Sequence, residues 1–338
     1  MKVFVSEFLV GGASARGDSP VSMRQEGLAM LEAVAADIAR MPGYVVVTTL
    51  ETGVRSSLAA EIIHVVDANQ ESAVFQQQLK QVDAVLVIAP ETDGILAGRC
   101  RQVTESGATS WNCSPEAIEL CGDKLRLARH LEWQGVATIG TEQMDFREPP
   151  DRSAWPIVLK PRDGAGSQLT FLIRDSNDWD RALSEIRAAG KTGKMISQPF
   201  VPGRALSVGA NIRWDGSGIE LLPIGEQRLS DEGRFQYLGG KIPANLSNSN
   251  CHNIREVVMA ACRSAPGLAG FIGFDLILTE ESQPLIVEIN PRLTTSYLGY
   301  RQLFPGALPE RWISASASLP NPSQSQQFVE FDVPEMLK

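Results

Sequence analysis

Strand-like and helix-like patterns of hydrophobic positions alternate along the first 110 residues. β-Rich or continuously apolar segments, typical of strands, occur at residues 3–6, 44–49, 62–66 and 82–88. Helical periodicity fills the intervals at residues 23–40, 72–81 and 96–105. This order predicts an α/β domain with an open parallel sheet, whose ligand crevice lies at the carboxyl ends of the strands.

Candidate substrate-binding residues follow two of these strands. Glu7 ends the first strand and precedes Gly11 and Gly12, and Glu91 follows the apolar strand at 82–88. All four fall on the edge of the sheet where ligands bind. The two glycines lack the G-x-G-x-x-G spacing of a dinucleotide site, and a turn without any ligand explains them equally well.

Residues 111–200 combine capped helices with short strands. Asp123 is the predicted N-cap of a helix over residues 124–134, which places Lys124 in its first turn. The helix dipole disfavours a cation there, and a bound anion would offset that cost. Further elements are predicted as helices at 115–120 and 179–188 and strands at 135–139, 155–161, 169–173 and 194–201.

A glycine-rich segment joins the strands at 155–161 and 169–173. It contains Gly164, Ala165, Gly166 and Ser167. Such a flap can fold its backbone N–H groups over phosphates, although most turns of this composition are simple hairpins. Lys160 lies four residues before the first of these glycines, within an apolar strand, and favours the phosphate-binding interpretation.

A hinge is predicted where the strand at 194–201 ends, in the segment Gln198, Pro199, Phe200 and Val201. Pro199 and the following Pro202 leave backbone groups of the segment without partners. An adenine ring can use such main-chain groups as hydrogen-bond partners.

The region from 201 to 320 is organised around a hairpin. Strands at 206–213 and 219–223, a polar and glycine-rich segment, and helices at 252–263 and 294–303 surround two strands at 271–278 and 285–289. Arg213 and Lys241 are candidate catalytic cations on the approach to the hairpin, and a solvated surface charge is the more common explanation for each. Residues 321–338 are predicted to form a loosely ordered tail.

Two carboxylates and an amide share one face of this hairpin. Side chains alternate along a strand, so Glu288 and Asn290 point the same way, and Asp275 can face Glu288 across the pair. Oxygen ligands without Cys or His suit Mg²⁺ or Mn²⁺, which bind nucleotide phosphates through one or two carboxylates. Pro291 ends the strand and places Arg292 beside the metals. The alternative is a plain hairpin with solvated acids.

Composition narrows the class of protein. The chain has 338 residues, 43% hydrophobic and 21% charged, enough for two or three globular cores. The net charge of −9 argues against a general nucleic-acid binder. No apolar run reaches the length of a membrane span, the start lacks the apolar segment of a signal peptide, and the five cysteines form no CxxC pair. We therefore expect a cytoplasmic protein with reduced thiols, with a homodimer as one compatible assembly.

The order and spacing of these segments resemble the ATP-grasp superfamily over roughly residues 110–315. By this resemblance Lys124 and Lys160 would hold the α- and β-phosphates of ATP, and the glycine-rich segment would be the phosphate flap. Gln198 and Val201 would frame the adenine. The implied fold is a pre-ATP-grasp α/β domain at 1–110, a small ATP-grasp subdomain with the flap at 111–200, and a C-terminal ATP-grasp subdomain with the metal site at 201–320.

The same resemblance assigns roles to the hairpin. Asp275, Glu288 and Asn290 would hold two Mg²⁺ ions. Arg292 would stabilise the transferring phosphoryl group or the tetrahedral intermediate.

One position departs from the family pattern. Members usually carry a Glu shortly after the glycine that corresponds to Gly203, where it binds the ribose, and no acid follows Gly203 here. Ribose recognition would then come from main chain or from Glu226. A narrower resemblance, at residues 5–12, 89–91 and 287–292, is to the tyramine–glutamate ligase-like enzymes of methanofuran-type cofactor synthesis.

The function that the resemblance implies is ATP-dependent ligation of a small-molecule carboxylate to an amine through an acyl phosphate. The narrower group implies glutamate and a tyramine- or tyrosine-like amine. Alternatives with the same ATP site are a carboxylase, a carbamoyl-phosphate-synthase-like enzyme or a kinase. A further alternative, from another class, is a non-catalytic ATP-binding regulatory protein.

Overall fold

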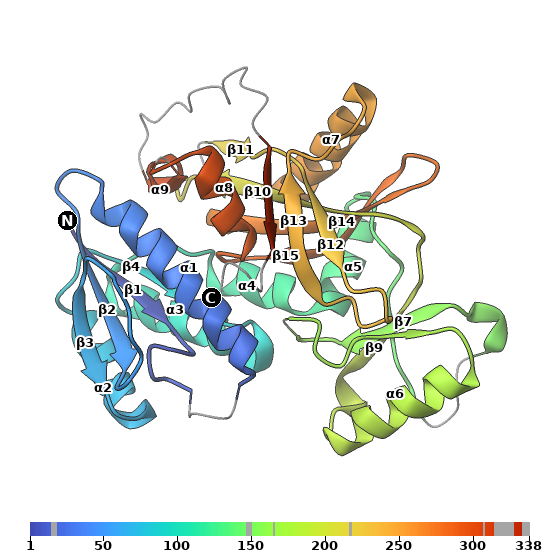
Figure 1. Ribbon diagram of the computed structural model, residues 1–338, viewed down its shortest axis with the longest axis horizontal. Coiled ribbons are helices and arrows are strands. Elements are labelled where there is room, and N and C mark those ends of the chain that lie inside the picture. Colours follow the sequence, from blue (N-terminus) through green and yellow to red (C-terminus); the bar gives the residue numbers. More distant parts are fainter. Residues whose placement is uncertain are drawn as a thin grey trace.

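Three β-sheets make up the fold (Figure 1). The computed structural model describes residues 1–14, 19–146, 151–164, 166–215, 218–306, 308–313 and 328–332. An open parallel sheet comes first along the chain, and two largely antiparallel sheets with helices follow it. The predicted fold class is therefore confirmed.

The N-terminal sheet is parallel, with the strand order β3-β2-β1-β4-β5. Its strands are β1 (Lys2–Glu7), β2 (Val45–Glu51), β3 (Glu61–Val65), β4 (Ala84–Ile88) and β5 (Thr109–Ser110), connected by α1 (Val21–Ala39), α2 (Ala68–Gln78) and, after a 3₁₀ turn at Thr92–Gly94, α3 (Ile95–Ser106). Val3 and Val5 pack with Leu31 of α1, whereas Phe4 between them packs with Phe75 of α2. Period-two alternation in β1 thus explains why helices cover both faces of the sheet.

The smallest sheet has the order β6-β9-β7-β8. Helices α4 (Pro115–Gly122) and α5 (Lys124–Trp133) lead into it, and it consists of β6 (Glu142–Gln143), β7 (Ile157–Pro161), β8 (Phe171–Ile173) and β9 (Met195–Pro199) with helix α6 (Ser176–Ala188). The carboxylate of Asp175 accepts two backbone N–H bonds and begins α6. Trp179 of α6 packs against Leu159 and Ile173 in a hydrophobic cluster separate from the two larger cores.

The largest sheet has the order β15-β14-β10-β12-β13-β16, with β11 paired to β10. Its strands are β10 (Gly203–Ile212), β11 (Ile219–Leu221), β12 (Gly225–Leu229), β13 (Tyr237–Ile242), β14 (Gly270–Thr279), β15 (Pro284–Asn290) and β16 (Val329–Asp332), and its helices are α7 (Asn248–Ser264), α8 (Ser296–Leu303) and α9 (Leu308–Ile313). One face packs on α7 through Ile254 and Val258. The other packs on α8 and α9, where Phe271 of β14 lies edge-on to Tyr297 and Trp312.

Three predictions of local structure were wrong. Residues 135–139 form no strand, and only an isolated bridge joins Thr138 to Ile286. The polar, glycine-rich segment after residue 223 contains β12 and β13, which its glycines concealed because glycine has low strand propensity. Part of the predicted loose tail is strand β16, whose Phe331 packs against Tyr237.

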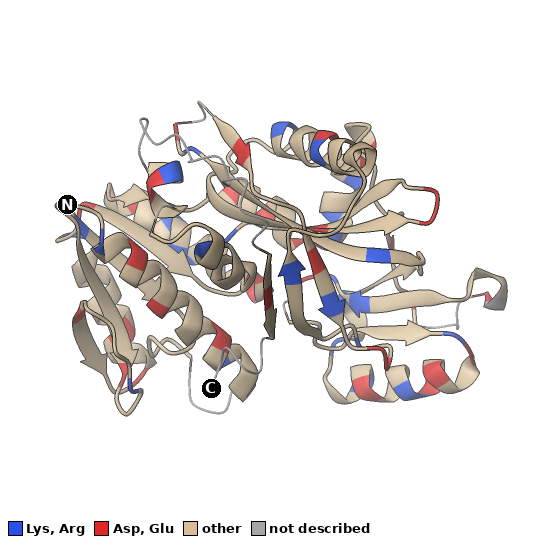
Figure 2. Ribbon diagram, turned by 45° about the horizontal axis from the view of Figure 1, so that its top comes forward, with Lys and Arg blue, Asp and Glu red and all other residues tan. Residues whose placement is uncertain are grey.

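Acidic and basic residues are interspersed over the helices and strands, and α6 is one of the helices that carry both kinds (Figure 2). Among the described residues, no helix is both long enough and apolar enough to cross a membrane.

Candidate active site

A cavity of about 710 Å³ opens where residues of all three sheets meet. The N-terminal sheet contributes Glu7 from the end of β1, the smallest sheet contributes Lys160 of β7, and the largest contributes Asp275 of β14. The carboxyl end of β1 is the sheet edge at which the sequence predicted a ligand crevice.

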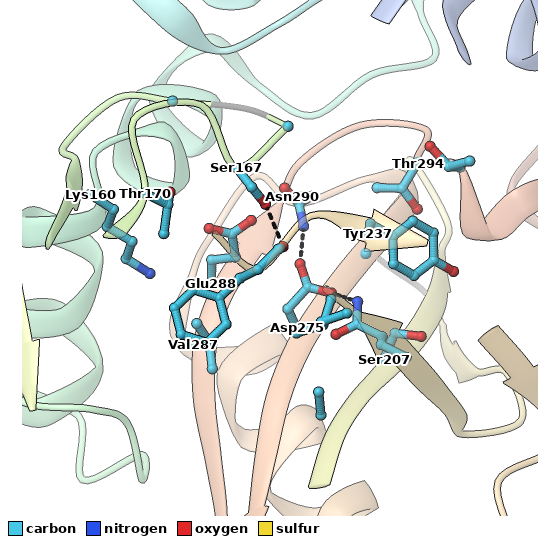
Figure 3. A pocket seen from close by; sticks show the side chains of 18 of the residues that line it. Lys160, Ser167, Thr170, Ser207, Tyr237, Asp275, Val287, Glu288, Asn290 and Thr294 are labelled. Atoms are coloured by element: carbon cyan, nitrogen blue, oxygen red, sulfur yellow. Dashed lines mark hydrogen bonds between the residues drawn. The ribbon is translucent and has the colours of Figure 1, made fainter. Parts of the chain in front are cut away.

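Asp275, Glu288 and Asn290 form a cluster of oxygen-bearing side chains in the wall of the cavity, which we call the oxygen cluster (Figure 3). Asp275 lies directly opposite Glu288 in the β14–β15 register, as predicted from the alternation along both strands. The Asn290 amide Nδ2 donates to Asp275 Oδ2 at 2.9 Å, and Gln227 Nε2 of β12 donates to Asp275 Oδ1 at 2.7 Å. Ile289 points away into the core.

The two carboxylates of the oxygen cluster differ in their electrostatic surroundings. Burial and the neighbouring Glu288 charge raise the pKa of Asp275. Burial acts in the same direction on Glu288, but the ammonium groups of Lys124 and Lys160 outweigh it and hold the pKa of Glu288 low. A cation bound between the two would stabilise both as carboxylates.

The donor set of the oxygen cluster fits a hard divalent cation. Two carboxylates and an amide oxygen match the ligands of Mg²⁺ or Mn²⁺, with phosphate oxygens available to complete the coordination. Among the described residues no three His, Cys, Asp or Glu side chains come together as a metal site. The cluster would therefore hold a cation together with a phosphate-bearing substrate.

Two lysines lie beside the oxygen cluster. Lys124 Nζ donates to the Gly164 carbonyl at 2.8 Å and lies 3.3 Å from Glu288 Oε2. Lys160 is buried within β7, and burial lowers its pKa to about 8. No carboxylate in the described part of the chain lies within ion-pair distance of Lys160 Nζ, and its side chain points towards Glu288 in Figure 3. These two cations equip this end of the cavity to bind an anion.

The glycine-rich segment lies over the cavity and contacts two other elements. Ser167 Oγ donates to the Phe235 carbonyl at 2.8 Å, and Gln168 Nε2 contacts Met23 Sδ of α1 at 2.9 Å. Gly166 has a φ of +68° and needs glycine, whereas Gly164 lies outside that backbone region and lines the cavity. Ala165, which was also predicted to bind phosphate, lies outside the described residues.

The predicted hinge also lines the cavity. Gln198, Pro199, Phe200 and Val201 all border it. Gln198 Nε2 donates to Thr141 Oγ1 at 2.7 Å, whereas no described residue hydrogen-bonds the backbone of Val201. Beside the hinge, Arg204 forms a two-bonded ion pair with Glu226 of β12, with both distances at 2.9 Å.

Arg292 connects the largest sheet to the N-terminal sheet. Its Nε donates to Glu91 Oε1 at 2.8 Å, and both side chains are largely buried. Burial alone would lower the pKa of Arg292, but the Glu91 and Glu288 charges raise it instead. Arg292 is therefore a permanent cation in the cavity wall, anchored by a residue that follows β4.

Part of the cavity wall is formed by α1 and the loops after β1 and β15, and we call this part the acceptor end. It is lined by Leu9, Met23, Glu26, Met30 and Thr295. Thr295 Oγ1 donates to Glu26 Oε2 at 2.9 Å. Three apolar side chains, one carboxylate and one threonine hydroxyl thus make up this part of the cavity wall.

The placement of Arg213 and Lys241 near the hairpin site was wrong. Arg213 follows the far end of β10 and pairs with Asp215 at 2.8 Å. Lys241 of β13 lies 4.2 Å from the ring centre of Phe328. Neither residue lines the cavity. Each is held by a neighbour outside the site, as the surface-charge alternative anticipated.

The substrate candidates near β1 divide into two groups. Gly11 and Gly12 do not line the cavity, and a Cβ on them would lie 2.0 Å from the Glu7 carbonyl oxygen and 2.4 Å from Val65 Cγ2. They form a tight turn, which agrees with the alternative explanation that this segment is a turn that binds no ligand. Glu7 does line the cavity, and burial raises its pKa to about 7 despite N–H bonds from the following backbone.

Several cavity residues escaped the sequence analysis. Gln227 and Tyr237 lie on β12 and β13, which were read as loop, and Glu26 and Thr295 lie on opposite sides of an interface between segments distant in sequence. The polar face of α1 was the one available signal for Glu26, and a polar residue on an amphipathic helix is ordinarily solvated.

Two known domain families match successive parts of the chain. The ATP-grasp domain matches residues 121–296, and the pre ATP-grasp 3 domain matches residues 44–118. Since the first match covers more than half of the chain, this protein belongs to the ATP-grasp family.

Individual proteins of the family share only a modest fraction of their residues with this chain. The chain is 27% identical over 222 residues to tyramine–L-glutamate ligase of Methanocaldococcus fervens, covering 66% of this chain and 62% of that protein. It is also 27% identical over 225 residues to D-alanine–D-alanine ligase of Bordetella petrii, covering 61% and 65%. Both matches span less than two thirds of the relative's own length. An ATP-grasp superfamily protein from Archaeoglobus fulgidus shares the fold, with a TM-score of 0.68, 22% identity and coverage of 90% and 84%.

Proposed function

We propose that this protein is an ATP-dependent carboxylate–amine ligase that forms an amide through an acyl phosphate. One observation carries the proposal. Arg292, clamped by Glu91, lies in the cavity wall within electrostatic reach of Glu288 in the oxygen cluster and of Glu26 at the acceptor end. A fixed guanidinium between a phosphate-binding end and a substrate end suits a reaction in which negative charge develops between the two.

ATP would occupy the side of the cavity between the hinge and the oxygen cluster. The free backbone of Val201 would pair with the adenine, and Lys124 and Lys160 would bind the phosphates. Glu226 would bind the ribose, oriented by its ion pair with Arg204. This arrangement supplies from β12 the acid that is missing after Gly203. The oxygen cluster would hold the divalent cations, which neutralise phosphate charge when bound.

The chemistry requires two transfers. A substrate carboxylate oxygen attacks the γ-phosphorus, the bond from phosphorus to the bridging oxygen breaks, and ADP leaves. The amine nitrogen then attacks the acyl carbon, the carbon–oxygen bond to phosphate breaks, and an amide forms. Starting from an ammonium, the nitrogen loses two protons, one of which ends on the departing phosphate while the other is released to solvent. Arg292 would balance the oxyanion of the tetrahedral adduct, while the flap and the apolar walls would limit access of water to the acyl phosphate.

Glutamate and tyramine are the substrates to test first. They are named by the relative from Methanocaldococcus fervens, and the narrower sequence resemblance points to the same pair. The apolar and acidic character of the acceptor end supports an amine with an apolar body.

The deciding experiment measures ADP release with Mg²⁺ as each substrate is omitted in turn, with hydroxylamine added to trap an acyl phosphate. A ligase requires the carboxylate for the trapped hydroxamate and requires both substrates for sustained ADP release. Activity with bicarbonate in place of the organic carboxylate would indicate a carboxylase, and a stable phosphorylated product would indicate a kinase. ATP binding without any substrate-dependent ADP release would overturn the proposal.

A further inference from the structure

The acceptor end of the cavity carries a carboxylate without an ionic partner. Glu26 is half-buried on α1 and accepts a hydrogen bond from Thr295 at 2.9 Å. No Lys or Arg in the described part of the chain lies within ion-pair distance of it. A half-buried carboxylate that faces a cavity is favoured when a cationic ligand binds there.

The cations around Glu26 are already engaged. Arg24, on the same helix, binds Glu51 Oε2 and the Leu9 carbonyl, both at 2.5 Å. Arg292 is held by Glu91. Among the described residues that line the acceptor end, none is a cation available for a carboxylate of the acceptor.

The rest of the acceptor end is apolar. Leu9 and Met30 are buried, Met23 is partly exposed, and all three line the cavity. Methionine side chains adapt their shape and contact aromatic rings favourably. An apolar or aromatic group beside a cation is the ligand that this surface complements.

Backbone packing holds Glu26 in this position. The adjacent Gly27 approaches Glu7 so closely that a Cβ there would lie 2.4 Å from Glu7 Oε1. Only glycine lets α1 pack against the buried Glu7 at this point. On the other side, Thr295 lies three residues after Arg292, so the hydrogen bond to Glu26 joins the acceptor end to the reaction centre.

We propose that the amine substrate binds as an ammonium ion on Glu26, with its apolar body against Leu9, Met23 and Met30, and that this site selects primary amines without a neighbouring carboxylate. The inference rests on the proposed function and names its acceptor class. Glu26 is a substrate-binding residue in this scheme. An amino-acid acceptor would place its own carboxylate close to Glu26 without a compensating cation, and repulsion would weaken its binding.

The test compares tyramine with tyrosine, which share the aryl body and differ by the carboxylate. With glutamate and ATP, the wild-type protein should use tyramine with a kcat/KM at least roughly 10-fold above that for tyrosine. Glu26→Gln should raise the KM for tyramine by on the order of 10- to 100-fold with little change in kcat. The ratio of kcat/KM for tyramine to that for tyrosine should therefore fall. Glu26→Lys should shift the substrate preference from tyramine towards tyrosine.

A matched control lies on the same helix. Glu32 hydrogen-bonds Ser56 and does not line the cavity, so Glu32→Gln should leave the KM for tyramine unchanged. Direct titration of tyramine and 2-phenylethylamine, in the presence of a non-hydrolysable ATP analogue, should show binding to the wild-type protein and to Glu32→Gln and at least roughly 10-fold weaker binding to Glu26→Gln.

The outcomes separate the two proposals. If glutamate-dependent hydroxamate forms but tyrosine serves as well as tyramine, or Glu26→Gln leaves the KM for tyramine unchanged, the acceptor assignment is overturned and the ligase stands. If neither amine binds to the wild-type protein at millimolar concentration, the acceptor assignment also fails. Absence of both hydroxamate and substrate-dependent ADP release overturns the ligase proposal itself, and titration then still reports on Glu26.

Discussion

The oxygen cluster and the acceptor end line one cavity, and they are built in different ways. The oxygen cluster lies on paired strands, its side chains hydrogen-bond one another, and two lysines stand beside it. The acceptor end joins a helix of the N-terminal unit to the loop after β15 through one hydrogen bond, and its carboxylate has no ionic partner among the described residues. Rigid, charge-compensated geometry suits phosphoryl transfer, whereas a sparse apolar surface suits the selection of one substrate.

Breaking the oxygen cluster should have the largest effect. Glu288→Gln removes the carboxylate that faces Lys124 and Lys160, and with it a charge that divalent cations need. We expect a loss of ADP formation of more than roughly 10³-fold with the melting temperature nearly unchanged. Glu281→Gln, in the exposed turn of the same hairpin, is the control and should keep full activity. Full turnover by Glu288→Gln would mean that the hairpin is not the metal site.

Substitution of Arg292 should have the second largest effect on activity. Arg292→Lys keeps the charge but loses the planar fork that binds Glu91, and we expect kcat to fall on the order of 10²-fold with little change in ATP affinity. Arg292→Ala should lose more. Kinetics, ATP titration and thermal unfolding of both variants test this. A lower melting temperature with normal kcat per folded molecule would show that Arg292 only holds the sheets together.

The flap should give a smaller effect, measured on the use of ATP. Gly166→Val forces a β-branched residue into a φ of +68°, and we expect kcat/KM for ATP to fall by on the order of 10- to 100-fold through flap misplacement. Gly190→Val is the matched control, because Gly190 has a φ of +65° with open space around it outside the cavity. Equal losses of ATP use in both variants would favour an ordinary hairpin at 164–167.

The last prediction concerns folding stability rather than activity, at Glu7 of β1. Burial raises the pKa of Glu7 to about 7 from 4.5, so between these pH values the folded protein holds a proton that the unfolded chain has released. The stability that Glu7 contributes is present below pH 4.5 and is lost as the pH rises through 7. Relative to Glu7→Gln, the wild-type unfolding free energy should fall by on the order of 3 kcal/mol over this window. Denaturant unfolding at several pH values measures it, and parallel curves for the two proteins would contradict it.

Much of the phosphate end was predictable from the sequence because its geometry is local. Alternation along residues 271–278 and 285–289, with a short turn between them, was enough to place Asp275 opposite Glu288 and to turn Ile289 into the core. The strand and helix periods of the first 110 residues were likewise enough for a parallel sheet with its crevice beside Glu7. Both inferences use only the direction of neighbouring side chains, which the backbone period determines.

Tertiary structure decided the rest, since it depends on which distant surfaces pack together. Glu91 and Arg292 are 201 positions apart, and Glu26 and Thr295 are 269 apart, so no local pattern records either pair. Conversely, Arg213 and Lys241 have the residue type of a phosphate ligand but lie outside the cavity, Arg213 beyond the far end of β10 and Lys241 beside Phe328. The sequence by itself determined the oxygen cluster and the order of the sheets. The packing of distant segments against one another determined that Arg292 pairs with Glu91 and that Glu26 meets Thr295.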